Sequence, residues 1–236
     1  MKKEELLQKA KPILFNTDML RAILDGRKTE TRRLIKSQQL IGILPDKCKN
    51  GMPEEFLKEK KFMFKPYCDM TDAELIKAAY NPPYQPGDVL YVRETWSPVF
   101  VVPRRYLYKV GCEEAENLPI KWHPSIHMPK EAARIWLKVK DVRVERLQEI
   151  TEEQTEAEGF QFTPPCLSKV SEDSYCDLDG PCTNKIKYCD MSAGELFGKV
   201  LWDSTIKKSD LDRYGWDANP WVWVIKFERC EKPENW

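Results

Sequence analysis

One short basic segment constrains this chain of 236 residues more than any other. Gly26-Arg-Lys-Thr-Glu-Thr-Arg-Arg33 places four cations and two hydroxyls in eight residues. The segment follows an expected amphipathic helix, and Gly26 stands where a left-handed helix end is favoured. We therefore expect the chain to turn at once, which would bring side chains three residues apart, such as Lys28 and Thr31, into one small volume.

The charge balance limits what this segment can do. Thirty-eight basic and thirty-eight acidic residues cancel, so any binding of nucleic acid must come from a local patch. The 42% hydrophobic content is enough for a packed core. No apolar run approaches the roughly 20 residues of a membrane span, and we expect a cytoplasmic protein without a membrane partner.

Hydrophobic patterning predicts both strands and helices, and therefore an α+β chain. Asn16 or Thr17 can cap the first helix, Thr71 with Glu74 a later one, and Thr151 with Gln154 a third. Strands are expected at residues 11–15, 89–96, 133–147 with a bulge near 140–141, and 221–227. Residues 100–110 are a candidate strand pair that is broken at Pro103. The helices after the first are expected at 53–62, 71–80, 149–158 and 192–202. Residues 37–83 and 161–191 have the character of insertions.

Metal binding is not predicted. Four of the eight cysteines, at positions 166, 176, 182 and 189, are separated by ten, six and seven residues. These spacings lack the short two-cysteine turn that usually holds structural zinc, so we expect free thiols and no complete zinc site. His123 and His127 are expected to have structural roles.

Six segments carry a resemblance to a known family. They are Lys11-Pro-Ile-Leu-Phe-Asn-Thr17, Ile23-Leu-Asp-Gly-Arg-Lys-Thr-Glu-Thr-Arg-Arg33, Pro86-Gly-Asp-Val-Leu-Tyr-Val-Arg-Glu-Thr-Trp96, Pro124-Ser-Ile-His-Met-Pro129, Ile150-Thr-Glu-Glu-Gln-Thr-Glu-Ala-Glu-Gly159 and Asn219-Pro-Trp-Val-Trp-Val-Ile-Lys-Phe-Glu228. In this order they resemble the ASCH family, a PUA-like group associated with RNA and often found in longer forms in phage and prophage. The resemblance implies a single domain over residues 1–236, built as a mixed β-barrel with flanking helices and two insertions.

The resemblance also implies a candidate site. Members that deacetylate N4-acetylcytidine use a Lys and a Thr three apart in the basic turn and a Glu at the end of a helix, which correspond to Lys28, Thr31 and Glu158. An anionic residue in the last turn of a helix is opposed by the helix dipole, so Glu158 needs a compensating partner. Lys28, pressed between Arg27 and Arg32, would act as base for Thr31, with Glu158 orienting Lys28 or carrying the proton. No metal or cofactor is required, and Thr29 remains an alternative hydroxyl.

Two alternatives use the same cleft without this chemistry. A non-catalytic RNA-binding module would present Arg32, Arg33 and Arg93 to phosphates, with Arg27 also in contact with the RNA. Trp96 or Tyr91 would stack on an unpaired base of single-stranded RNA. A metal-independent ribonuclease would use the same basic residues. The sequence leaves the oligomeric state open.

Overall fold

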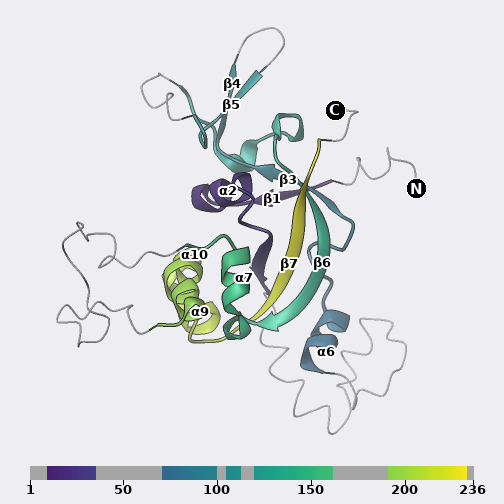
Figure 1. Ribbon diagram of the computed structural model, residues 1–236, viewed down its shortest axis with the longest axis vertical. Helices are drawn as coiled ribbons and strands as arrows, with labels where there is room; N and C mark the ends of the chain where they lie inside the picture. Colours follow the sequence, from purple (N-terminus) through teal and green to yellow (C-terminus); the bar gives the residue numbers. More distant parts are fainter. Residues whose placement is uncertain (1–9, 36–70, 100–104, 113–119, 162–190, 233–236) are drawn as a thin grey trace, which may run out of the picture.

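A computed structural model describes residues 10–35, 71–99, 105–112, 120–161 and 191–232, and shows a mixed α+β chain (Figure 1). Its strands are β1 (Lys11–Leu14), β2 (Glu30–Leu34), β3 (Val89–Arg93), β4 (Trp96–Val99), β5 (Arg105–Tyr108), β6 (Trp136–Arg146) and β7 (Trp221–Cys230). Five of them form one sheet in the order β1-β3-β6-β7-β2, and β4 pairs with β5 in a separate ribbon. Only β1 and β3 run parallel; the other neighbours among the described strands are antiparallel.

The expected barrel is not a closed barrel in this part of the chain. β1 and β2 are the two edges of the sheet, and no backbone ladder joins them among the described strands. One side chain connects the edges, because Nη2 of Arg33 donates to the carbonyl of Leu14 at 2.6 Å. The described architecture is therefore a five-stranded mixed sheet whose edges are joined by a side chain.

The two longest strands form the spine of the sheet. β6 and β7 pair from Trp136 opposite Cys230 to Arg146 opposite Trp221, and both curve along their length (Figure 1). Their register shifts between Val139 and Asp141, which confirms the expected bulge. Bulges bend strands, so this position contributes to the curvature.

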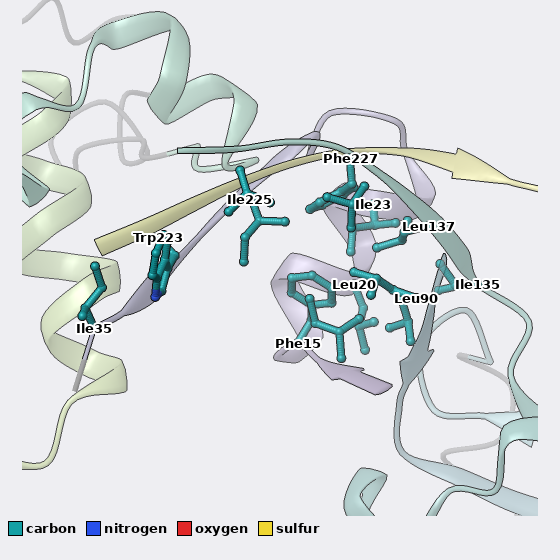
Figure 2. Packing of buried hydrophobic residues seen from close by; sticks show 14 of the residues in the cluster. Phe15, Leu20, Ile23, Ile35, Leu90, Ile135, Leu137, Trp223, Ile225 and Phe227 are labelled. Carbon is teal, nitrogen blue, oxygen red and sulfur yellow. The ribbon is translucent and has the colours of Figure 1, made fainter. Parts of the chain in front are cut away.

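The main core lies between the sheet and helix α2 (Thr17–Leu24). Asn16 caps α2 by accepting from the backbone N–H of Met19 at 2.8 Å, as its side-chain chemistry predicts. Leu20 and Ile23 of α2 pack among the aromatic and aliphatic side chains of the strands, and Figure 2 shows these side chains gathered between the helix and the sheet. Trp223 is buried here as well.

A second hydrophobic cluster lies beside the end of β6 and the start of β7. It joins Val222 and Val224 of β7 to a group of short helices. These are α7 (Glu152–Ala157), α9 (Ala193–Leu196), a π-helix (Phe197–Trp202) and α10 (Asp203–Thr205), grouped together in Figure 1. The capping box of α7 at Thr151 and Gln154 is confirmed, with Gly159 beyond the helix at a φ of 74°.

Two expectations about strands are wrong. Residues 30–34 form β2, where we expected a turn, because they pair with residues 222–226 of β7 and their local sequence does not reveal that distant partner. Residues 89–96 do not form one strand either, since the chain leaves the sheet at Glu94. That carboxylate is fully buried and binds Arg134 at 2.9 and 2.8 Å, which takes residue 94 away from the β3 ladder.

Several expectations concern residues outside the described ranges: the helix at 53–62, residues 100–104 and the cysteines at 166, 176, 182 and 189. Helix α6 (Asp72–Ala79) confirms the capping box of Thr71 and Glu74, and its Ile76 is fully buried in the main core. Five further short helices in the described ranges are α11 (Leu211–Tyr214) and the 3₁₀ turns Ser125–His127, Lys130–Ala132, Leu147–Glu149 and Lys208–Asp210. None of the described helices is long and apolar enough to cross a membrane.

Candidate functional site

The ends of two helices meet at the candidate site. α2 ends before Gly26, whose φ is 79°, and the backbone N–H groups of Arg27 and Lys28 donate back to the carbonyl of Ala22 at 2.9 and 3.0 Å. The next N–H, of Thr29, donates to the carbonyl of Ala157 in α7 at 2.7 Å. Residues 27–29 thereby satisfy carbonyl groups that a helix end leaves without a partner.

Gly159 permits this contact to be close. A Cβ atom at residue 159 would lie 2.5 Å from the Cβ of Ala22 and 2.9 Å from that of Lys28, distances that no pair of packed carbon atoms tolerates. Its φ of 74° also lies in the left-handed region that favours glycine. Glycine is therefore required at this position both by the backbone conformation and by the neighbouring helix.

Lys28 and Glu158 form a buried ion pair at this junction. Nζ of Lys28 lies 2.5 Å from Oε2 of Glu158 and 2.8 Å from its backbone carbonyl, and the two side chains are 0% and 2% exposed. The cation offsets the unfavourable position of an anion at the end of α7. Lys28 is thus a compensating partner of the kind that we expected for Glu158.

The charge of Lys28 is costly in this position. Burial lowers the pKa of its ammonium below the ordinary value, and the cations of Arg33 and Arg32 act in the same direction, while Glu158 opposes them. A lysine with a lowered pKa gives up its proton more readily than an exposed lysine does, which suits a group in proton transfer.

The second carboxylate oxygen of Glu158 faces Arg32. Nη1 of Arg32 lies 3.3 Å from Oε1 of Glu158, while Nη2 binds Gln154 at 2.6 Å and Glu145 at 3.3 Å. Nε of this guanidinium is buried and has no hydrogen-bond partner among the described residues. Glu158 is consequently held from both sides by cations, and the Nε–H of Arg32 stays unused.

A cavity of about 210 Å³ adjoins this cluster. Thr31, Arg32 and Glu158 all line it, whereas Lys28 is not on its wall. The hydroxyl of Thr31 has no hydrogen-bond partner in the described part of the chain, and Thr29 is absent from the lining. The structure therefore brings Thr31 and Glu158 to one cavity and places Lys28 directly behind Glu158.

Two larger hollows adjoin the cavity and share lining residues with it. One, of about 480 Å³, shares Glu158 and Met19 and continues past Arg21 and Arg27. The other, of about 430 Å³, shares Leu14 and Arg33 and is also lined by Arg93. The candidate site is thus a cavity that shares wall residues with two neighbouring hollows.

Of the two remaining residues expected at the site, Arg27 lines the hollow that shares Glu158 with the cavity, whereas Trp96 lies away from it. Arg27 pairs with Asp25 at 2.9 Å and donates to the carbonyl of Gly159 at 3.1 Å. Trp96 packs against Tyr106 and His123 and lines none of the three hollows. Among the described residues, no group of three or more His, Cys, Asp or Glu side chains is placed to hold a metal ion.

Sequence reasoning missed the apolar wall of the cavity. Phe197, Leu201 and Trp202 line it from the π-helix, and Phe15 lines it from the end of β1. Trp202 is fixed by a hydrogen bond from its Nε1 to the carbonyl of Tyr214 at 2.8 Å. The sequence signals a helix at residues 192–202, but the π-helical geometry is not predictable from it, although such irregular turns often occur at functional sites.

Comparisons of this chain with protein-family models, with curated proteins and with solved structures found no match.

Proposed function

We propose that this protein hydrolyses the exocyclic amide of an N4-acylated cytosine nucleoside, most concretely N4-acetylcytidine, in the cavity beside Thr31 and Glu158. The single observation that carries the proposal is the buried Lys28–Glu158 pair, one of whose members lines a cavity together with the hydroxyl of Thr31. Amide hydrolysis needs a nucleophile, a group that takes and returns its proton, and a donor for the oxyanion. Each has a counterpart here.

The reaction proceeds in two steps, acyl transfer to Thr31 and hydrolysis of the resulting ester. The hydroxyl of Thr31 attacks the acyl carbon, its proton passes to the Lys28–Glu158 pair, and the pair returns the proton to N4 as the carbon–nitrogen bond breaks. Water then hydrolyses the acyl ester, releasing the carboxylic acid and restoring the hydroxyl. The unused Nε–H of Arg32 is the donor for the developing oxyanion.

The size of the cavity supports a base with a small acyl group. At about 210 Å³ it is smaller than the roughly 300–1,000 Å³ of pockets that enclose a drug-sized ligand. The aromatic and aliphatic wall from Phe15 and the π-helix suits a planar base, and the ribose would extend into an adjoining hollow. We also propose that the described sheet is the core of the PUA-like barrel that the resemblance implies.

The test is turnover of N4-acetylcytidine followed by its ultraviolet spectrum, with product identified as cytidine and acetate. We expect hydrolysis by the wild-type protein and a loss of about a hundredfold or more in Lys28→Met. Absence of hydrolysis across N4-acetyl-, N4-propionyl- and N4-benzoylcytidine would refute the proposal.

A second candidate function is binding of single-stranded RNA without chemistry. It is favoured by one observation: both polar contacts of the Lys28 amine go to Glu158, and none reaches Thr31 among the described residues. A binding module would show no turnover, and Lys28→Met would change its affinity for RNA no more than Arg33→Met does. In an enzyme the two variants would differ in turnover, because Lys28→Met removes a titrating amine and Arg33→Met does not.

A further inference from the structure

The hollow on the β1 side of the cavity has an unusual charge. Eight residues line it, of which Arg33 and Arg93 are cations and none is a carboxylate. Neither guanidinium is paired with an Asp or Glu anywhere in the described ranges. Arg33 donates to the carbonyl of Leu14, and Arg93 to the carbonyl of Ile126 at 3.2 Å and the hydroxyl of Tyr91 at 3.1 Å. Two positive charges therefore stand in one hollow without an anion.

Unused donors accompany these charges. A guanidinium has five N–H groups, and the neutral acceptors just named take one from Arg33 and two from Arg93. Nε of Arg93 is buried with no partner among the described residues. Burial also lowers the pKa of Arg33, although Tyr84 and the carboxylate of Glu158 act in the opposite direction. A buried donor without an acceptor is unfavourable, so an anionic ligand would gain from binding here.

The hollow on the other side of the cavity differs in this respect. Both of its cations have a carboxylate partner, because Arg21 lies 3.6 Å from Asp18 and Arg27 lies 2.9 Å from Asp25. Asp18 itself lines that hollow. An anionic part of a ligand in the central cavity would therefore lie on the β1 side, where Arg33 lines both spaces.

We propose that the hollow between Arg33 and Arg93 is a phosphate subsite, so that the substrate of the central cavity is a nucleotide or an oligonucleotide and not a free nucleoside. This proposal rests on the proposed function for the identity of the base. The acylated base occupies the central cavity, and the phosphate attached to its ribose receives N–H donors from both arginines. Arginine suits this role because its donors form a planar fork that matches phosphate oxygens.

The experiment measures binding and hydrolysis separately. Calorimetry compares cytidine, its 5′- and 3′-monophosphates and a cytidine dinucleotide, and kcat/KM is compared for the N4-acetyl forms of the same four compounds. We expect at least one phosphate-bearing ligand to bind about tenfold or more tightly than cytidine, a factor that corresponds to one charge-assisted contact. Its affinity should fall with added salt, while that of cytidine should not. The mononucleotide and dinucleotide arms distinguish a terminal phosphate from an internucleotide one.

Arg93→Gln should reduce the ratio of nucleotide to nucleoside affinity by about tenfold. The matched control is Arg105→Gln, which removes an exposed arginine of β5 that lines none of the three hollows and should leave the ratio unchanged. Arg33→Gln is the second variant, and thermal unfolding checks that each variant is folded. Equal or undetectable binding of all four ligands, or equal ratios in Arg93→Gln and the control, overturns the subsite.

The outcomes also separate this proposal from the proposed function. Hydrolysis of N4-acetylcytidine with no preference for a phosphate overturns the subsite and leaves the hydrolase. Phosphate-dependent binding that Arg93→Gln abolishes, without any hydrolysis, overturns the hydrolase and leaves the subsite.

Discussion

The ammonium of Lys28 donates to both the carboxylate and the backbone carbonyl of Glu158, at 2.5 and 2.8 Å. The same contact therefore ends helix α7, fixes the turn after α2 and places a carboxylate on the wall of the cavity. Because Arg32 binds the other carboxylate oxygen, Glu158 is the anion that two buried cations share. Glu158 has two cationic partners, whereas Lys28 has one anionic partner among the described residues. We therefore expect the loss of Glu158 to reduce stability more than the loss of Lys28.

Glu158→Gln is expected to destabilise the protein more than Lys28→Met does. The first change leaves the charges of Lys28 and Arg32 buried beside a neutral side chain, at a cost of about 3–5 kcal/mol in the free energy of unfolding. The second leaves Glu158 still paired with Arg32, so about 1–3 kcal/mol is expected. Urea unfolding measures both. An equal loss in the two variants would show that Arg32 does not compensate Glu158.

Gly159→Ala tests the close approach of the two helix ends. The new Cβ would collide with Ala22 and Lys28. We expect the free energy of unfolding to fall by about 2–4 kcal/mol, partly from this steric clash and partly from the cost of a positive φ at alanine. Gly26→Ala is the matched control, since Gly26 has a similar φ but no atom within 4 Å of the position that a Cβ would occupy. Its free energy of unfolding should fall only by the cost of a positive φ at alanine, about 1 kcal/mol. Equal losses would mean that the contact with Lys28 is unimportant.

Alkaline pH should favour the wild-type protein over Lys28→Met. The folded-state pKa of Lys28 lies below its ordinary value of 10.5, mainly through burial. Between those two values the unfolded chain binds more protons than the folded one, so the contribution of Lys28 to the free energy of unfolding rises with pH. Below the lowered pKa the cost of the buried charge is present in full. We measure the free energy of unfolding of the wild type and of Lys28→Met by urea at several pH values up to the ordinary lysine pKa. The value for the wild type minus that for Lys28→Met should rise with pH. A fall would mean that the pKa of Lys28 is raised in the folded protein and not lowered.

Local chemistry explains which parts of the fold the sequence predicts. Asn16, Thr151 and Gly159 each act through atoms a few residues away, and their caps and turns follow from side-chain type alone. The pairing of β2 with β7 joins segments from opposite ends of the chain, so the basic segment gives no local sign that it is a strand. The same limit applies to the site. The apolar wall containing Trp202 depends on the packing of the π-helix, which no spacing in the sequence encodes.

The choice between Thr31 and Thr29 is the sharpest test of the proposed chemistry. Thr31 is 2% exposed and lines the cavity with Glu158, whereas Thr29 is half-buried and is held through its backbone, by Ala157 on one side and Phe227 on the other. Valine has nearly the same shape as threonine, so each Thr→Val change removes a hydroxyl with little change in volume. Because the Thr31 hydroxyl has no partner among the described residues, its removal should leave stability within about 1 kcal/mol of wild type.

We expect Thr31→Val to lose about a hundredfold or more in turnover of N4-acetylcytidine, while Thr29→Val stays within a few-fold of wild type. Thr31→Ser supplies a hydroxyl again and should recover part of the lost rate, which a purely structural role for Thr31 would not produce. If Thr31→Val is as active as Thr29→Val, the hydroxyl is not the nucleophile. The proton-transfer role of the Lys28–Glu158 pair would then apply to a water molecule in the cavity, and Lys28→Met would remain inactive in the same assay.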